Sequence, residues 1–171
     1  MPRKGMTIAA LRRRARELGA LGAKAVSPRK VYTAAWVRMK CRYGCGGFGG
    51  CLTCPPNSPT PEETRKMLDD YRRALLIHGA RTANLRTLVA TLEREAFLSG
   101  HYKAFGFACG PCRLCRTCDF DRGCRHPEKA RPAMEACGID VYRTAREAGF
   151  QIEVVRDEDD PQNYFALLLI D

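Results

Sequence analysis

The sequence predicts an α/β fold class: a single mixed sheet with packed helices and two cysteine-rich metal-binding loops. Three observations support this class. The chain has 171 residues, 45% of them apolar, which is enough for one domain, 1–171, with a real core. Segments with helical and strand periodicity alternate along it. All ten cysteines lie in two short segments, a first loop at 41–61 and a second at 109–137.

Composition excludes several classes of protein. The apolar content is too high for general disorder, and no stretch approaches the roughly 18 apolar residues of a membrane span, so we expect no membrane partner. The start of the chain lacks the apolar core of a secretory signal. We therefore expect a cytoplasmic protein, in which cellular reductants keep thiols reduced. In that setting, ten cysteines favour metal binding over disulfides.

The positive charge is concentrated near the N-terminus. Residues 1–40 hold 11 Lys and Arg and one acid, so their net charge of +10 accounts for the whole excess of the chain. Segment 1–22 predicts a basic helix with Thr7 as its N-cap and Gly19 as its end. We favour a solvated face on an amphipathic helix over a patch for nucleic acid or an acidic protein. The buried stripe of that helix would be Ile8, Leu11, Ala15 and Leu18.

The segments that follow predict an extended piece, a strand and then a loop. Ala23–Val26 is extended, and Val31–Lys40 reads mostly as a strand that leads to Cys41. The loop at 41–61 is rich in glycine, cysteine and proline, which leaves little room for regular structure.

Two helices and a strand are expected in the middle of the chain. Thr60 as N-cap and Pro61 at the first helical position begin a helix that reaches about Tyr71. Arg73–His78 predicts a short buried strand, and Asn84–Ser99 a long helix capped by its asparagine.

The last third of the chain predicts three strands around two helical segments. Lys103–Ala108 is expected to be a strand that leads to the second cysteine loop. A turn of helix follows near Pro132–Ala136, and a helix near Val141–Ala148. Phe150–Arg156 and Tyr164–Ile170 read as two strands, most simply an antiparallel hairpin.

The first cysteine group has the spacing Cys41-x3-Cys45-x5-Cys51-x2-Cys54. Four thiolates in so short a segment converge on one centre only if the chain folds back tightly. Glycines between them permit such turns and let N–H groups approach sulfur. These glycines are Gly44, Gly46, Gly47, Gly49 and Gly50.

The second cysteine group is denser and offers two registers. Three cysteines at two-residue gaps surround one corner of a cubane cluster, as in ferredoxins. We favour the register that ends with Cys124 as a remote fourth ligand, which leaves Cys109 and Cys137 spare. The group comprises Cys109, Cys112, Cys115, Cys118 and Cys124, with Cys137 further along.

Zinc is the main competitor of an iron–sulfur cluster. Structural zinc sites use paired two-cysteine knuckles with a longer spacer, which the second group lacks. The second group therefore favours iron–sulfur, and the first group is less decisive. His126, two residues after Cys124, is either a ligand, a hydrogen-bond donor to a cluster or a structural residue.

Two blocks, GCGGFGGCLTCPPNSPTPEE and GPCRLCRTCDFDRGCRHPEKARPAMEACGIDV, resemble the signatures of a known family. This is the uncharacterised, cysteine-rich "predicted metal-binding protein" family, a domain of unknown function. The resemblance extends over most of the chain beyond about residue 20. It implies a cytosolic iron–sulfur protein and supplies no established reaction. Carried over by position, it implies metal-associated cysteines at Cys41, Cys45, Cys54, Cys112, Cys115, Cys118 and Cys124.

The chain departs from the family pattern at Cys51, Cys109 and Cys137, which look like additions. The first centre therefore has either three protein ligands or four. The difference matters because a three-cysteine cubane leaves one iron free to bind a substrate, whereas a fourth cysteine closes it.

Three functions are compatible with the sequence, and whether the protein is an enzyme stays open. The leading hypothesis is an iron–sulfur redox protein that passes electrons through one or two 4Fe-4S clusters to a redox partner protein. The second is an iron–sulfur enzyme whose open cluster iron acts on a small substrate. The third is a zinc-stabilised binding module that uses the basic helix. The predicted metal ligands are Cys41, Cys45, Cys51, Cys54, Cys112, Cys115, Cys118 and Cys124.

Overall fold

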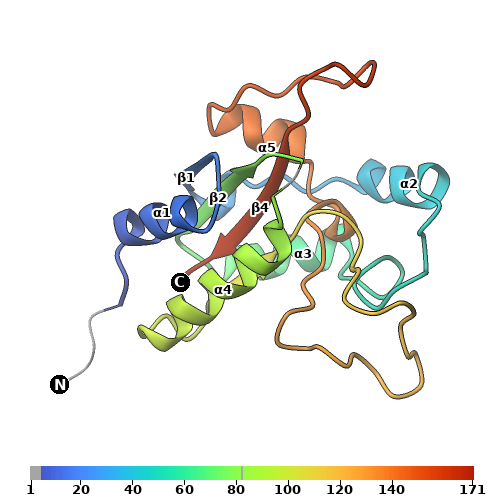
Figure 1. Ribbon diagram of the computed structural model, residues 1–171, viewed down its shortest axis with the longest axis horizontal. Helices are drawn as coiled ribbons and strands as arrows, with labels where there is room; N and C mark the ends of the chain where they lie inside the picture. Colours follow the sequence, from blue (N-terminus) through green and yellow to red (C-terminus); the bar gives the residue numbers. More distant parts are fainter. Residues whose placement is uncertain (1–4, 82) are drawn as a thin grey trace.

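Helices cover both faces of one antiparallel sheet (Figure 1). The computed structural model describes residues 5–81 and 83–171, so residues 1–4 of the predicted basic segment lie outside the described residues. The strands lie in the order β1-β2-β4-β3, and each neighbouring pair is antiparallel. The predicted α/β class with a single sheet is confirmed. The strands are β1 (Gly22–Val26), β2 (Ala74–Gly79), β3 (Phe105–Phe107) and β4 (Tyr164–Leu169).

The side chains of the central strand β2 alternate between two hydrophobic layers, because successive residues of a strand point to opposite faces. Leu75 and Ile77 pack in the first layer, and Ala74 and Leu76 pack in the second. The first layer is completed by α1 (Ile8–Glu17) and α4 (Leu85–Leu98), and the second by α3 (Pro61–Asp69) and α5 (Val141–Glu147).

The basic helix α1 is amphipathic, as predicted. Leu11 and Ala15 are fully buried in the first layer, and Ile8 and Leu18 pack against the same core. Neighbouring arginines such as Arg12, Arg13 and Arg16 are exposed on the opposite face, an arrangement that fits either a solvated face or a binding patch.

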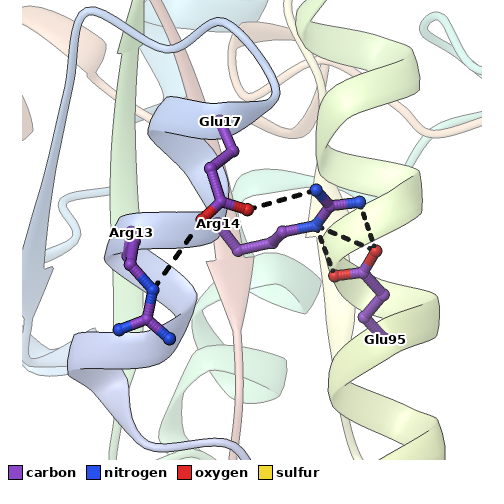
Figure 2. Close-up of polar contacts among 4 residues, drawn as sticks. All are labelled: Arg13, Arg14, Glu17 and Glu95. Carbon is purple, nitrogen blue, oxygen red and sulfur yellow. Dashed lines mark hydrogen bonds and ion pairs between the residues drawn. The ribbon is translucent and has the colours of Figure 1, made fainter.

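Part of the positive charge of α1 is neutralised within the molecule (Figure 2). The guanidinium of Arg14 forms a two-pronged pair with the carboxylate of Glu95 on α4, with an Nη2–Oε1 distance of 2.9 Å. The carboxylate of Glu17 forms ion pairs with both Arg13 and Arg14. The pair of Arg14 with Glu95 therefore joins α1 to α4, whereas the pairs of Glu17 lie within α1.

Three of the helices begin where their capping residues predict. The side chains of Thr7 and Asn84 accept backbone hydrogen bonds at the starts of α1 and α4. Thr60 and Glu63 form a reciprocal capping box at the start of α3, with Pro61 in the first turn. A cap satisfies backbone N–H groups that have no partner inside the helix, so this local chemistry fixes the boundary.

The predicted strand over Val31–Lys40 is wrong, because this segment forms a helix instead. The helix α2 spans Ala35–Gly44, and only an isolated bridge between Thr33 and Ile139 remains of strand pairing. Val37 is buried on the inner side of α2. The residues before Cys41 include good helix formers, and a strand needs a neighbouring strand that the fold does not supply here.

The predicted hairpin between Phe150–Arg156 and the last strand is also wrong. Residues 151–156 form no strand. Strand β4 lies between β2 and β3 and pairs with both, so neither of its edges is free for a third partner. Phe150 and Ile152 instead pack into the second layer beside α5.

Short helical turns complete the fold. Two 3-10 turns are present, η1 (Pro28–Lys30) and η2 (Glu135–Cys137), the second where a turn of helix was expected near Pro132–Ala136. Within the described residues, no helix is long and apolar enough to cross a membrane.

Candidate metal centre

The first cysteine segment, Cys41–Cys54, starts on a helix and ends in a series of tight turns. Cys41 lies in the last turns of α2, so the predicted loop at 41–61 begins only after Gly44. The backbone then doubles back, and the N–H of Gly49 donates to the carbonyl of Pro55 at 2.9 Å. Gly49 has a φ of +73°, a backbone conformation that a glycine adopts without strain.

Cys51 and Cys54 form the buried part of this segment. Their sulfur atoms lie 3.1 Å apart, and the hydroxyl of Thr53 lies 3.5 Å from the sulfur of Cys51. Burial raises the pKa of Cys54 to about 12, and the neighbouring Cys51 adds to the effect. Burial also acts on Cys51, but hydrogen bonds from Thr53, Cys54 and the backbone of Cys112 outweigh it and lower its pKa.

Cys41 and Cys45 complete the first set of thiols. Burial raises the pKa of Cys41, and the thiol of Cys45 and the carboxyl of Glu135 raise it further. The charges of Cys51, Cys45 and Cys41 all contribute to the raised pKa of Cys54. Cys54 is thus the thiol of this set that the other three influence electrostatically.

The second cysteine segment, Cys109–Cys124, is an irregular loop without helix or strand among its described residues. Four of its thiols line one narrow pocket of about 20 Å³. Leu52 and Thr53 of the first segment line the same pocket. The two segments are therefore in contact, and together they form one side of the molecule (Figure 1). The four thiols are those of Cys112, Cys115, Cys118 and Cys124.

His126 lies beside the second set of thiols. Its backbone N–H donates to the sulfur of Cys124 over 3.4 Å, and the residue lines the same pocket. This contact uses the backbone and leaves open which of the three roles the imidazole ring of His126 takes.

Arg86 of α4 holds the start of the second segment. Its guanidinium donates to the carbonyls of Gly110 at 2.8 Å and Pro111 at 2.9 Å, and also to those of Cys109 and Arg131. The side chain is buried, with 8% of the residue exposed. One charged group thus ties together the two ends of the loop that carries four of the thiols.

An ion pair holds the far end of the same loop. The guanidinium of Arg131 and the carboxylate of Glu93 form two short contacts, 2.5 and 2.6 Å, with both side chains mostly buried. Glu93 also accepts the N–H of Gly106 in β3. The pair therefore links the loop to α4 and to the edge of the sheet.

Arg38 of α2 holds the end of the first cysteine loop by hydrogen bonds to backbone carbonyls, as Arg86 does for the second segment. Its guanidinium donates to the carbonyls of Pro59 at 2.7 Å and Ala136 at 3.2 Å. The hydroxyl of Ser58 donates to the same Ala136 carbonyl. The end of the first cysteine loop is therefore fastened to η2.

Of the two remaining cysteines, Cys137 is buried and Cys109 is half-buried. Burial raises the pKa of Cys109 and of Cys137 to about 12, and Glu135 raises both further. Cys137 is part of the second hydrophobic layer, where it is fully buried. Cys137 is therefore a core side chain, whereas Cys109 packs against the first layer and lines the cavity beside the first set.

A cavity of about 480 Å³ opens beside the first set of thiols. Cys41, Cys45 and Cys54 lie on its wall, together with Cys109 and Glu135. Burial raises the pKa of Glu135. Most of the other lining side chains are apolar or aromatic.

All ten cysteines are free thiols. In residues 5–81 and 83–171, no three Cys, His, Asp or Glu side chains stand close enough together to hold a metal ion. A metal would therefore draw the thiols of a set inward, and its binding would be coupled to the ordering of the loops. The donor set, four thiols in each group, fits an iron–sulfur cluster or zinc.

Two cysteine-rich segments with ten free thiols on an α/β frame are typical of a metal-binding protein. The model of the family described as "Predicted metal-binding protein (DUF2284)" matches residues 24–170, and the chain belongs to this family. This confirms the resemblance of the two sequence blocks. Among curated proteins and solved structures, none matches the chain.

Sequence reasoning misses three residues of this region. Arg38 and Arg86 bind backbone carbonyls that lie 20 or more residues away, and such contacts leave no local pattern. Glu135 is a single acid in a basic segment, and only its burial in the fold distinguishes it. An arginine at an inward position of an otherwise apolar helix stripe is the one available signal, and Arg86 provides it.

Proposed function

We propose that the protein is an iron–sulfur redox protein with two 4Fe-4S centres in contact with each other. The observation that carries this is the meeting of the two cysteine segments: Leu52 and Thr53 border the pocket of the second set, and the backbone of Cys112 is near enough to the sulfur of Cys51 to lower its pKa. Adjacent clusters exchange electrons, so this arrangement supports a two-centre relay.

The two ligand sets in this proposal are the ones that the spacing predicts. Thiolates hold the iron atoms, and a bound cluster supplies one-electron redox chemistry. The second centre lies on an exposed loop and is the entry point for a redox partner protein. The first centre lies deeper and borders the cavity. The ligands are Cys41, Cys45, Cys51 and Cys54 for the first centre, and Cys112, Cys115, Cys118 and Cys124 for the second.

The proposed cellular compartment follows from the redox chemistry of the thiols and clusters. Ten free thiols and air-sensitive clusters suit a reducing environment, so we propose a cytoplasmic location. The basic helix α1 stays available for a nucleic acid in the alternative in which the metal is zinc and the protein is a binding module.

The cavity favours a second candidate function, an enzyme with an open cluster iron. Three cysteines of the first set, Cys41, Cys45 and Cys54, line the cavity, and Cys51 is not among its described lining residues. If only Cys41, Cys45 and Cys54 held a cluster, one iron would lack a protein ligand, and the group would then supply Lewis acidity beside the cavity.

Metal analysis tests the leading proposal. The full chain is purified without oxygen, and its iron, sulfide and zinc contents are measured with the EPR spectrum of the reduced protein. We expect about eight iron and eight sulfide per chain and cubane-type signals. Two zinc and no iron would overturn the proposal and favour the zinc-stabilised module.

Single substitutions then assign the two centres. In Cys115→Ser and in Cys54→Ser, iron content is expected to fall by about half, each with the loss of one EPR signal. Cys137→Ala is the matched control, since this buried cysteine belongs to the core and is expected to leave both clusters intact. Equal iron content in all three variants contradicts the assignment.

Cys51 separates the two candidate functions. The open-iron enzyme predicts that Cys51→Ala keeps the first cluster whereas Cys45→Ala loses it. A closed four-cysteine centre predicts loss in both variants. Iron content and the EPR spectrum are the readouts, and neither requires a known substrate.

A further inference from the structure

The cavity beside the first cysteine set has the size and lining of a small-molecule site. Its volume of about 480 Å³ falls within the usual range for ligand pockets and is about three times that of a cavity that takes one benzene ring. A molecule with one or two rings fits such a space. Side chains from four separate segments form its apolar wall, among them Trp36, Phe48, Val141, Ile152 and Phe165.

One buried polar atom in this wall lacks a partner. The Oε2 atom of Glu135 is shielded from solvent and, among the described residues, is the buried side-chain atom without a hydrogen bond. A buried polar group without a partner costs free energy, and native folds usually supply one. A carboxyl group keeps an acceptor oxygen in either protonation state, so Glu135 can accept a hydrogen bond from a donor on a ligand in the cavity.

The mouth of the cavity carries no strong excess of charge. Lys40 and Asp140 lie there with opposite signs, and Asn163 is neutral. These groups do not select a strongly anionic or cationic ligand. Specificity therefore rests on the apolar walls and on the acceptor that Glu135 provides.

We propose that this cavity binds a small organic molecule with an aromatic or other apolar body and one N–H or O–H donor, which hydrogen-bonds the carboxyl of Glu135. This inference deepens the proposed function, because a ligand here sits beside Cys41, Cys45 and Cys54, the thiols of the first centre. Glu135 is the specificity-determining residue of the site.

A matched pair of probes tests the site. Indole carries an N–H donor, and benzofuran has the same shape with an oxygen acceptor in its place. Binding of each to the anaerobically purified full chain is measured by calorimetry. We expect indole to bind about tenfold more tightly than benzofuran, the effect of one hydrogen bond to a buried acceptor.

Two variants of Glu135 provide the controls. Glu135→Leu removes the acceptor and is expected to abolish the indole preference while benzofuran still binds, which shows that the cavity is intact. Glu135→Gln keeps an acceptor oxygen and is expected to retain the preference. Absence of binding by either probe to the wild-type chain, or an unchanged indole preference in Glu135→Leu, overturns the inference.

The outcome is separable from that of the proposed function. Iron and sulfide are measured on the same preparations. Tight indole binding by a protein without iron supports the ligand site and overturns the redox proposal. An iron–sulfur protein that binds neither probe does the reverse.

Discussion

The two cysteine segments carry similar chemistry on different supports. The first begins on helix α2, turns back on itself and buries Cys51 and Cys54. The second is an irregular loop whose thiols line a narrow pocket near the surface and whose ends are held by Arg86 and Arg131. The comparison teaches that one set is ordered by the core of the protein, whereas the other is ordered by two arginines and, we expect, by its metal.

Metal removal is expected to have the largest effect on local order and to distinguish the two cysteine segments most clearly. Without metal, the backbone of residues 111–130 has few contacts to keep it ordered, so its amide hydrogens should exchange freely. Residues of the sheet and of α2 should keep most of their protection. Hydrogen exchange before and after anaerobic chelation measures this. Equal loss of protection in both segments would show that the first also depends on its metal.

Gly138→Ala tests the anchoring of the first segment to the core. Gly138 has a φ of +77°, and a Cβ there would lie 2.4 Å from Cγ of Pro61 at the start of α3. Backbone strain and this clash together should lower the free energy of unfolding by about 2–4 kcal/mol. Urea denaturation is the measurement. Gly123→Ala is the control, since its φ of +86° is similar but its Cβ meets no atom within 4 Å.

Arg86→Met tests the clamp on the second segment. The substitution keeps much of the apolar stem and removes the hydrogen bonds to the loop carbonyls. We therefore expect the free energy of unfolding to fall by about 2–3 kcal/mol. Iron content of the second centre should fall as well, while the first centre is unaffected. Arg38→Met should show the opposite selectivity, because Arg38 holds the first segment.

Glu93→Gln tests the other end of the same loop and should have the smallest effect. Glutamine still accepts the N–H of Gly106 but loses the charge that pairs with Arg131. The free energy of unfolding is therefore expected to fall by about 1–2 kcal/mol, because the pair is mostly but not fully buried. Thermal unfolding at low and high salt checks it. A cost that matches that of Arg86→Met would indicate that both ends of the loop contribute equally.

Much of the fold can be predicted from the sequence wherever local chemistry decides the structure. The caps Thr7, Thr60 and Asn84 each satisfy N–H groups a few residues away, so their helices begin where expected. The segments at 31–40 and 150–156 were predicted as strands because their composition suits strands. Whether such a segment pairs depends on which edge of the sheet is free, and this is a property of the whole fold.

In the candidate site, too, local sequence predicts some features and others depend on the whole fold. Cysteine spacing suffices to predict two groups. In the fold, the four thiols of the second group line one pocket, and Cys51 and Cys54 of the first group are in contact. The supports of the site depend on distant partners: Arg86 reaches Pro111, and Arg38 reaches Ala136. The carboxyl of Glu135 becomes buried only when η2 packs beside α2, so no local sequence pattern predicts it.

The position of β4 between β2 and β3 has a consequence for synthesis of the protein on the ribosome. Both cysteine segments emerge before β4, which is the last strand of the described sheet. The halves of the sheet therefore stay unjoined until residues 164–169 leave the exit tunnel. The nascent chain therefore carries all ten thiols before the sheet that supports both cysteine segments can close.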